Sequence, residues 1–162
     1  MPLQKSSLSQ DLESLFKNKP SAAAQAASTW ASAYVSYASG ALSAASSLPV
    51  TAASNQSMLV GAFTAAFSSM TSAGAAALMS QGVIGFWTAM VWVGPTAVGT
   101  TVFPGNPALS GALAAIFADT SNQSESDKAR ALADAFDAGA KMIIVSDVPL
   151  VQPAPPIVGP VS

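Results

Sequence analysis

The spacing of apolar and polar residues predicts that this chain folds mainly as helices. Apolar residues recur every three or four positions within residues 8–17, which indicates a short helix. A second apolar stripe predicts a helix over residues 20–46, because the Leu48-Pro49 step disfavours helix beyond it. Three aromatic residues define that stripe: Trp30, Tyr34 and Tyr37.

The middle of the chain continues this pattern and then changes. Residues 55–81 carry another apolar stripe and predict one long helix, which Gln81-Gly82 interrupts. Residues 83–93 follow as the most hydrophobic piece, and their spacing fits a strand as well as a buried helix. Its large aromatic residues are Phe86, Trp87 and Trp92. Residues 96–105 are rich in Thr, Val, Gly and Pro and predict an extended or looped stretch.

The last third predicts a helical hairpin followed by short β structure. Asn106-Pro107 favours a helix start, with Asn as the cap and Pro in the first position. A second helix is expected after Ser124, with its charged residues facing solvent. Residues 142–145 and 148–151 are β-prone and flank Ser146-Asp147.

Together these elements predict a mainly α fold, a helical bundle or set of hairpins with a short β-prone C-terminal segment and an extended Pro-rich arm. Three parts are expected. Residues 1–19 form an N-terminal arm and a short helix, residues 20–151 form a helical domain with an uncharged core region, and residues 152–162 form the Pro-rich arm. We expect this arm to dock on another chain, because its prolines prevent regular internal hydrogen bonding.

The distribution of charged residues says more about this chain than any sequence motif does. Residues 20–118 contain no Asp, Glu, Lys, Arg or His, and charged residues make up 9% of the chain, against about 25% in an ordinary soluble domain. A surface without charges has little to keep it apart from other surfaces. We therefore expect the middle of the chain to be covered by other copies, by a different protein or by lipid.

Candidate chemistry is nearly absent. Without histidine or cysteine the chain has no imidazole base and no imidazole or thiolate metal ligand. The paired carboxylates Asp134 and Asp137 are expected on an exposed helix face, and no glycine-rich phosphate-binding motif occurs. The net charge of −2 argues against nucleic acid as a partner. We predict no catalytic residue, no cofactor and no metal, and hence no enzyme.

Lipid remains an alternative cover for the uncharged region. Residues 58–93 contain no charge and are long enough for one or two membrane spans. Against this, Ser and Thr interrupt the apolar run, and no Lys or Arg flanks it to fix an orientation. The alternative function is a pore or holin-like protein of the bacterial inner membrane.

The C-terminal third resembles small bacteriophage virion proteins from the tail or baseplate region. The residues that carry the resemblance are residues 106–109 (NPAL) and 128–137 (KARALADAFD), followed by the β-prone segment and the Pro-rich end. The resemblance implies a structural role in a multi-copy viral particle, without catalysis, and with other copies and other virion proteins as partners. The side chains expected to make such contacts are Trp30, Tyr34, Tyr37, Phe86, Trp87, Trp92, Ile157 and Val158.

Overall fold

In the computed structural model the chain is mainly helical, as predicted, with a small antiparallel sheet. The structure describes residues 3–43, 47–50, 55–103, 108–121, 123–149 and 156–161. Its helices are α1 (Lys5–Lys17), α2 (Ala23–Ala38), α3 (Gln56–Phe67), α4 (Ser72–Thr88), α5 (Leu109–Ala118) and α6 (Glu125–Ala140). Its strands are β1 (Val91–Val93), β2 (Ala97–Phe103), β3 (Ile144–Pro149) and β4 (Ile157–Pro160).

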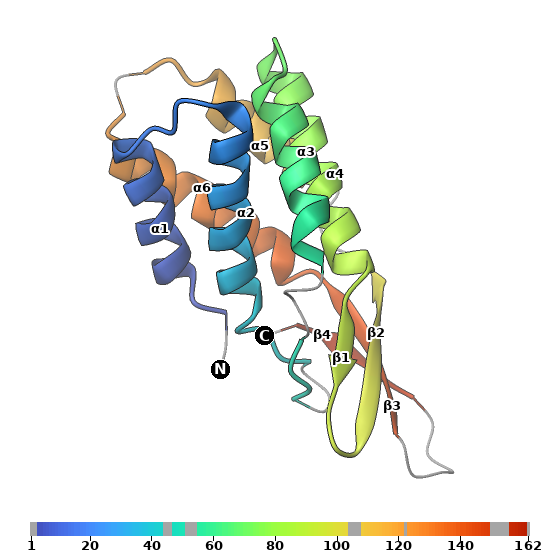
Figure 1. Ribbon diagram of the computed structural model, residues 1–162. Helices are drawn as coiled ribbons and strands as arrows, with labels where there is room; N and C mark the ends of the chain where they lie inside the picture. Colours follow the sequence, from blue (N-terminus) through green and yellow to red (C-terminus); the bar gives the residue numbers. More distant parts are fainter. Residues whose placement is uncertain are drawn as a thin grey trace.

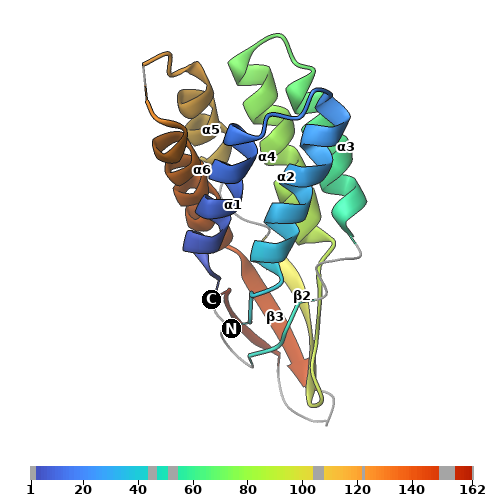
Figure 2. The ribbon, with the colours of Figure 1, turned by 60° about the vertical axis from the view of Figure 1, so that its left-hand side comes forward.

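The helices form a closed ring in which each packs against the next. Packing runs from α1 through α2, α3, α4 and α5 to α6, and α6 packs back against α1. Figures 1 and 2 show the helices side by side, with the sheet at one end of them. The charged N-terminal helix α1 and the charged helix α6 are therefore neighbours, although they are far apart in the sequence.

Local hydrogen bonds set several helix ends. The Thr71 hydroxyl caps α4 by accepting a hydrogen bond from the Gly74 N–H, and the Ser124 hydroxyl caps α6 by accepting one from the Asp127 N–H. The prediction of one long helix over residues 55–81 is therefore wrong. The chain turns back at residues 68–71, so that α3 and α4 pack against each other.

Glycines explain two further differences between the predicted and the observed helix bounds. The helix does not break at Gln81-Gly82, because α4 continues to Thr88. Gly82 instead brings α4 close to α3, and a Cβ at this position would clash with the Cβ of Ala62. Helix α2 ends at Ala38 instead of residue 46, and the N–H of Gly40 closes its last turn on the carbonyl of Tyr37.

The sheet has the order β1-β2-β3-β4, and all neighbouring strands are antiparallel. Residues 83–93 combine both predicted alternatives, because α4 takes their first part and β1 takes their last. Strand β3 runs without a break through Ser146 and Asp147, so it joins residues 144–145 of one predicted β-prone segment to residues 148–149 of the other.

The described part of the Pro-rich tail belongs to the chain's own sheet. Strand β4 pairs with β3, and the N–H of Val161 donates to the carbonyl of Ile143 over 3.0 Å. The expectation that this arm docks on another chain is thus wrong for residues 157–161. The predicted helix start at Asn106-Pro107 and residues 150–155 lie outside the described residues.

Single bridges tie Ser43 and Val50 to the two edges of the sheet. Ser43 pairs with Val161 beyond β4, and Val50 pairs with Trp92 of β1. The buried face of the sheet and the inside of the helix ring share one hydrophobic core. Trp87 of α4 stacks on Trp92 of β1, with ring centroids 6.2 Å apart.

Candidate assembly surfaces

Six of the eight residues predicted to make partner contacts lie in the core of the chain itself. Helix α2 supplies three of them, α4 two and β1 one, and none has more than 7% of its surface exposed. The six are Trp30, Tyr34, Tyr37, Phe86, Trp87 and Trp92. The stack of Trp87 on Trp92 joins the helix ring to the sheet. Five of the six side chains are enclosed by the chain itself, and Trp30 keeps 7% of its surface exposed where it lines a pocket.

The polar atoms of Tyr34, Tyr37 and Trp87 make hydrogen bonds within the chain. The Trp87 Nε1–H donates to the Tyr34 hydroxyl over 2.8 Å, and the Tyr37 hydroxyl donates to Asp137 Oδ1 over 2.8 Å. Burial raises the pKa of both tyrosine hydroxyls, and in Tyr37 the neighbouring Tyr34 and Asp137 raise it further. Trp and Tyr thus act here as core residues with a polar anchor.

Two aspartates, Asp137 and Asp147, are buried. The expectation of an exposed helix face is therefore wrong for Asp137, which accepts the Tyr37 hydrogen bond and pairs with Lys141 Nζ at 2.7 Å. Asp147 Oδ2 accepts a hydrogen bond from the Ser43 hydroxyl at 2.7 Å, while its Oδ1 has no hydrogen-bond partner among the described residues. The sequence signal for Asp147 was a carboxylate inside an apolar, strand-prone run.

Asp147 fits in the sheet because its cross-strand neighbour is a glycine. Gly99 faces Asp147 in the register, and a Cβ on it would lie 2.6 Å from Asp147 Oδ1. Together the Asp147–Ser43 and Asp137–Tyr37 hydrogen bonds fasten α2 and the segment after it to α6 and β3. Both carboxylates therefore serve the structure of the chain.

The remaining two predicted contact residues, Ile157 and Val158, are exposed. They retain 49% and 59% of their surface on β4. In the strand register Val158 faces the same side of the sheet as Ser146 and Val148, away from the buried Asp147 and Val145. We call this side the outer sheet face.

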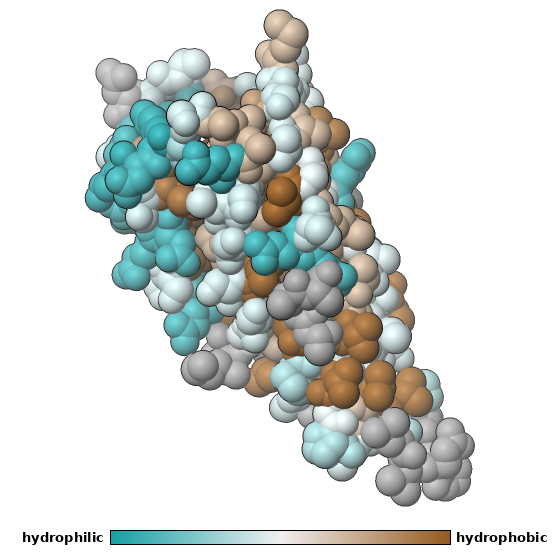
Figure 3. Space-filling model, in the orientation of Figure 1, coloured by the Kyte–Doolittle hydropathy of each residue, from teal (hydrophilic) through white to brown (hydrophobic). Residues whose placement is uncertain are grey.

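The outer sheet face is largely apolar and carries no charged residue. Its polar members are Thr100 and Ser146, and its apolar members are Val91, Val93, Val98, Phe103, Ile144, Val148, Val158 and Pro160. A groove lies between Phe103 and β4, and Lys141, which follows α6, is one of the residues that line it. The hydrophobic residues seen in Figure 3 gather over the sheet.

Charged side chains gather elsewhere. All of them except Asp147 lie on α1, on α6 or in the turns beside these two helices. The ion pair between Lys5 Nζ and Asp134 Oδ1, 2.6 Å apart, links α1 to α6. Figure 3 shows the hydrophilic residues concentrated on this side. The molecule therefore has one charged flank, formed by α1 and α6, and an uncharged remainder.

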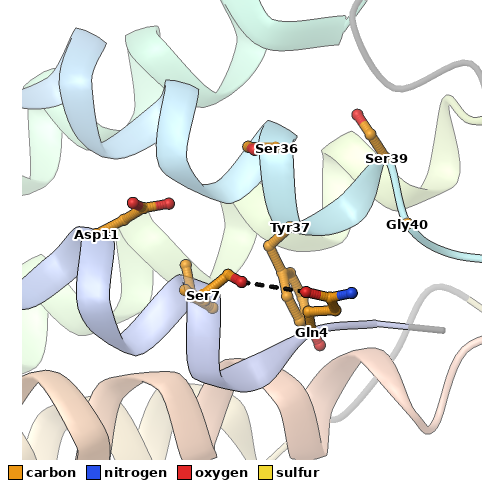
Figure 4. A pocket seen from close by; sticks show the side chains of 8 residues that line it. Gln4, Ser7, Asp11, Ser36, Tyr37, Ser39 and Gly40 are labelled. Carbon is orange, nitrogen blue, oxygen red and sulfur yellow. Dashed lines mark hydrogen bonds between the residues drawn. The ribbon is translucent and has the colours of Figure 1, made fainter. Parts of the chain in front are cut away.

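Several depressions lie in the described helical part, and two of them are relevant to a site. One is lined mainly by polar residues and sits between α1 and the C-terminal end of α2, where the Ser7 hydroxyl donates to Gln4 Oε1 over 3.2 Å (Figure 4). The other, which we call the helical-end pocket, has a volume of about 310 Å³ and is lined by aromatic and aliphatic residues together with Asp119 and Lys128. Its aromatic residues are Phe16, Trp30, Phe67 and Phe117.

Searches for other kinds of site gave negative findings within the described parts of the chain. No group of three or more carboxylates there is placed to hold a metal ion. No described helix has both the length and the apolar character needed to cross a membrane. Comparison with protein-family models, curated protein sequences and solved structures found no match.

Proposed function

We propose that this protein is a non-enzymatic structural subunit that assembles in many copies through its uncharged surfaces. The observation that carries the proposal is the segregation of charge. Every charged side chain but the buried Asp147 belongs to the charged flank or to its adjoining turns. The outer sheet face and the exposed sides of α3, α4 and α5 are left without any.

Burying such a surface against a partner is favourable. Apolar burial contributes roughly 25 cal/mol per Å², and no charged group has to lose its water on the uncharged side. Exposed valines on β1, β3 and β4 supply apolar area on the outer sheet face, with Val93, Val148 and Val158 among the most accessible. These three valines replace the buried aromatic residues as the contact residues of the proposal.

A second copy is the partner that this surface fits best. An uncharged face meets no unpaired charge when it packs against an identical face, and a two-fold contact between identical faces closes on itself. The charged flank would then remain in water and keep the assembly soluble. The sheet edge is a poorer contact, since Pro160 lacks an N–H with which to pair another strand.

The assembly we propose is a viral particle, with other virion proteins as further partners. The support is the resemblance of the C-terminal third to small bacteriophage tail or baseplate proteins. In this proposal the protein resides in the virion and needs neither cofactor nor catalytic residue. The buried carboxylates agree with such a role, because both hold helices and strands together.

Sedimentation of the purified protein tests the proposal. At micromolar concentration and without detergent we expect oligomers that dissociate on dilution, and electron microscopy should show regular particles at higher concentration. A stable monomer under these conditions would contradict the proposal. Flotation with liposomes that resists high salt and carbonate would instead favour the membrane-pore alternative.

A further inference from the structure

The end of the helix ring opposite the sheet carries the helical-end pocket. It lies where α1, α3 and α5 end and where α4 and α6 begin. Trp30, Met79 and Leu132 line it and are buried, while Asp119 and Lys128 are its charged lining residues. The aromatic and aliphatic part of the lining offers a space for an apolar group.

A candidate for that group projects from the same end. Met70, in the turn between α3 and α4, is 100% exposed, the highest value among the large hydrophobic residues that the structure describes as exposed. Hydrogen bonds order the turn around it. The Ser68 hydroxyl donates to the Thr64 carbonyl over 2.9 Å, and Thr71 caps α4. Figure 1 shows this turn projecting beyond the other helix ends.

We propose that Met70 of one copy inserts into the helical-end pocket of a second copy, and that the second copy returns the same contact. Phe67 and Ala75 line the pocket and flank the turn that carries Met70. Knob and pocket therefore lie side by side on one end of the molecule, which is the arrangement that a two-fold exchange requires. The flexible thioether of methionine suits an irregular pocket, and sulfur packs favourably against aromatic rings.

The charges around this end also favour a second copy, because both signs are mixed there. Lys17, Lys19 and Lys128 stand beside Asp119, Glu125 and Asp127. Lys17 pairs with Glu13 at 2.6 Å and interacts electrostatically with Glu125 of its own chain. A strongly acidic or strongly basic partner would meet like charges at this end, whereas a second copy carries the same balance of charge.

This inference rests on the proposed function and extends it, because it names a contact separate from the outer sheet face. The direct test is crosslinking, which is clean here because the chain contains no cysteine. A Met70→Cys protein is mixed with an Ile116→Cys protein, since Ile116 lines the pocket. Under mild oxidation we expect a disulfide-linked heterodimer.

The matched control is Met58→Cys, at the start of α3 and 45% exposed. It should form at least tenfold less heterodimer with the Ile116→Cys protein. Equal yields from Met58→Cys and Met70→Cys, or no crosslink from either while the wild type still forms oligomers, would overturn the inference and leave the proposed function standing. A monomeric wild type would contradict both the inference and the proposed function.

A second variant checks the inference without a crosslink. Met70→Ser should raise the dissociation constant of the end-to-end pair at least tenfold, whereas Met58→Ser should leave it within a factor of two. Circular dichroism should show unchanged helix content in both proteins, since neither side chain belongs to the core. Equal dissociation constants for the two variants would overturn the inference.

Discussion

The helix pairs α1–α6 and α3–α4 belong to the same ring, yet different contacts hold them. Between α1 and α6 an ion pair joins Lys5 to Asp134, and both side chains are about half exposed. Helices α3 and α4 contain no charged residue, and they meet where Gly82 lies against Ala62. The first pair presents charge to water, and the second presents uncharged surface to whatever covers it.

This difference shows which contacts stabilise the fold, and which surfaces remain for association, in a chain with so few charged residues. Small residues allow close helix approach, and a few large aromatic residues supply the buried area. Phe86 and Trp87 are fully buried, and Phe86 contacts the ring of Tyr34. Charge is then left to the flank, where it favours solubility more than folding.

The largest expected effect comes from the core between these pairs. Phe86→Ala should lower the free energy of unfolding by about 3–5 kcal/mol, because it removes a fully buried ring from the contact with Tyr34 and Trp87. Urea unfolding followed by circular dichroism measures this loss. A change below about 1 kcal/mol would mean that this core is not packed as described.

A smaller effect is expected where α3 and α4 touch. Gly82→Ala should destabilise the protein by about 1–3 kcal/mol, since the added methyl group meets Ala62. Adding Ala62→Gly should restore part of the loss. Gly61→Ala is the matched control, because nothing lies within 4 Å of its Cβ position, and it should stabilise by about 0.5–1 kcal/mol. Equal effects of both substitutions on thermal unfolding would contradict close packing at Gly82.

Alkaline pH probes the polar anchors of the aromatic core. Burial holds the pKa of Tyr34 and Tyr37 above the value of about 10 found in unfolded chains. Above pH 10 the unfolded state therefore binds fewer protons than the folded state. The free energy of unfolding should fall by about 1.4 kcal/mol per pH unit for each tyrosine, and the full stability should be present below pH 10.

Tyr37→Phe separates the two contributions, because the chain has only these two tyrosines. The variant should show about half the slope of the wild type between pH 10 and 11. A stability that stays constant from pH 9 to 11 would show that the two hydroxyls are accessible to water.

The smallest effect is expected on the charged flank. Asp134→Ala removes the partner of Lys5, but the surrounding water already screens this pair. We expect no resolvable shift in the thermal midpoint of this variant. Added salt should likewise leave the thermal midpoint of the wild type unchanged. A loss comparable to that of Gly82→Ala would show that ion pairs hold the ring together after all.

An element of this fold can be predicted from the sequence when the contact that sets its bounds joins residues close together in the chain. Ser124 caps α6 by accepting a hydrogen bond from the N–H of Asp127, three residues on, and the helix after it was predicted correctly, although its Asp137 is buried instead of facing solvent. The turn at residues 68–71 was missed because the apolar spacing of the sequence continues across it. Only the hydroxyl cap at Thr71 marks the start of a new helix. Periodicity alone reads such a stripe as one helix.

The candidate site was harder to predict, because exposure is a tertiary property. The spacing of Trp30, Tyr34 and Tyr37 in the sequence is the same for a helix face that packs in its own core and for one that contacts a partner. The closed ring of helices shows that these residues are buried. Asp147 is buried through pairing of β3 with β2 and a hydrogen bond from Ser43, 104 residues away in the chain. Val158 was expected to contact another chain; it is exposed, and its strand pairs within its own chain.

The most direct test of the account places the same new charge on both regions. Val148→Lys puts it on the outer sheet face, and Ala138→Lys puts it on an exposed position of α6 in the charged flank. Sedimentation velocity at several micromolar concentrations should show a dissociation constant at least tenfold higher for Val148→Lys, and an unchanged one for Ala138→Lys. Equal association of the two variants would contradict assembly through the uncharged surface.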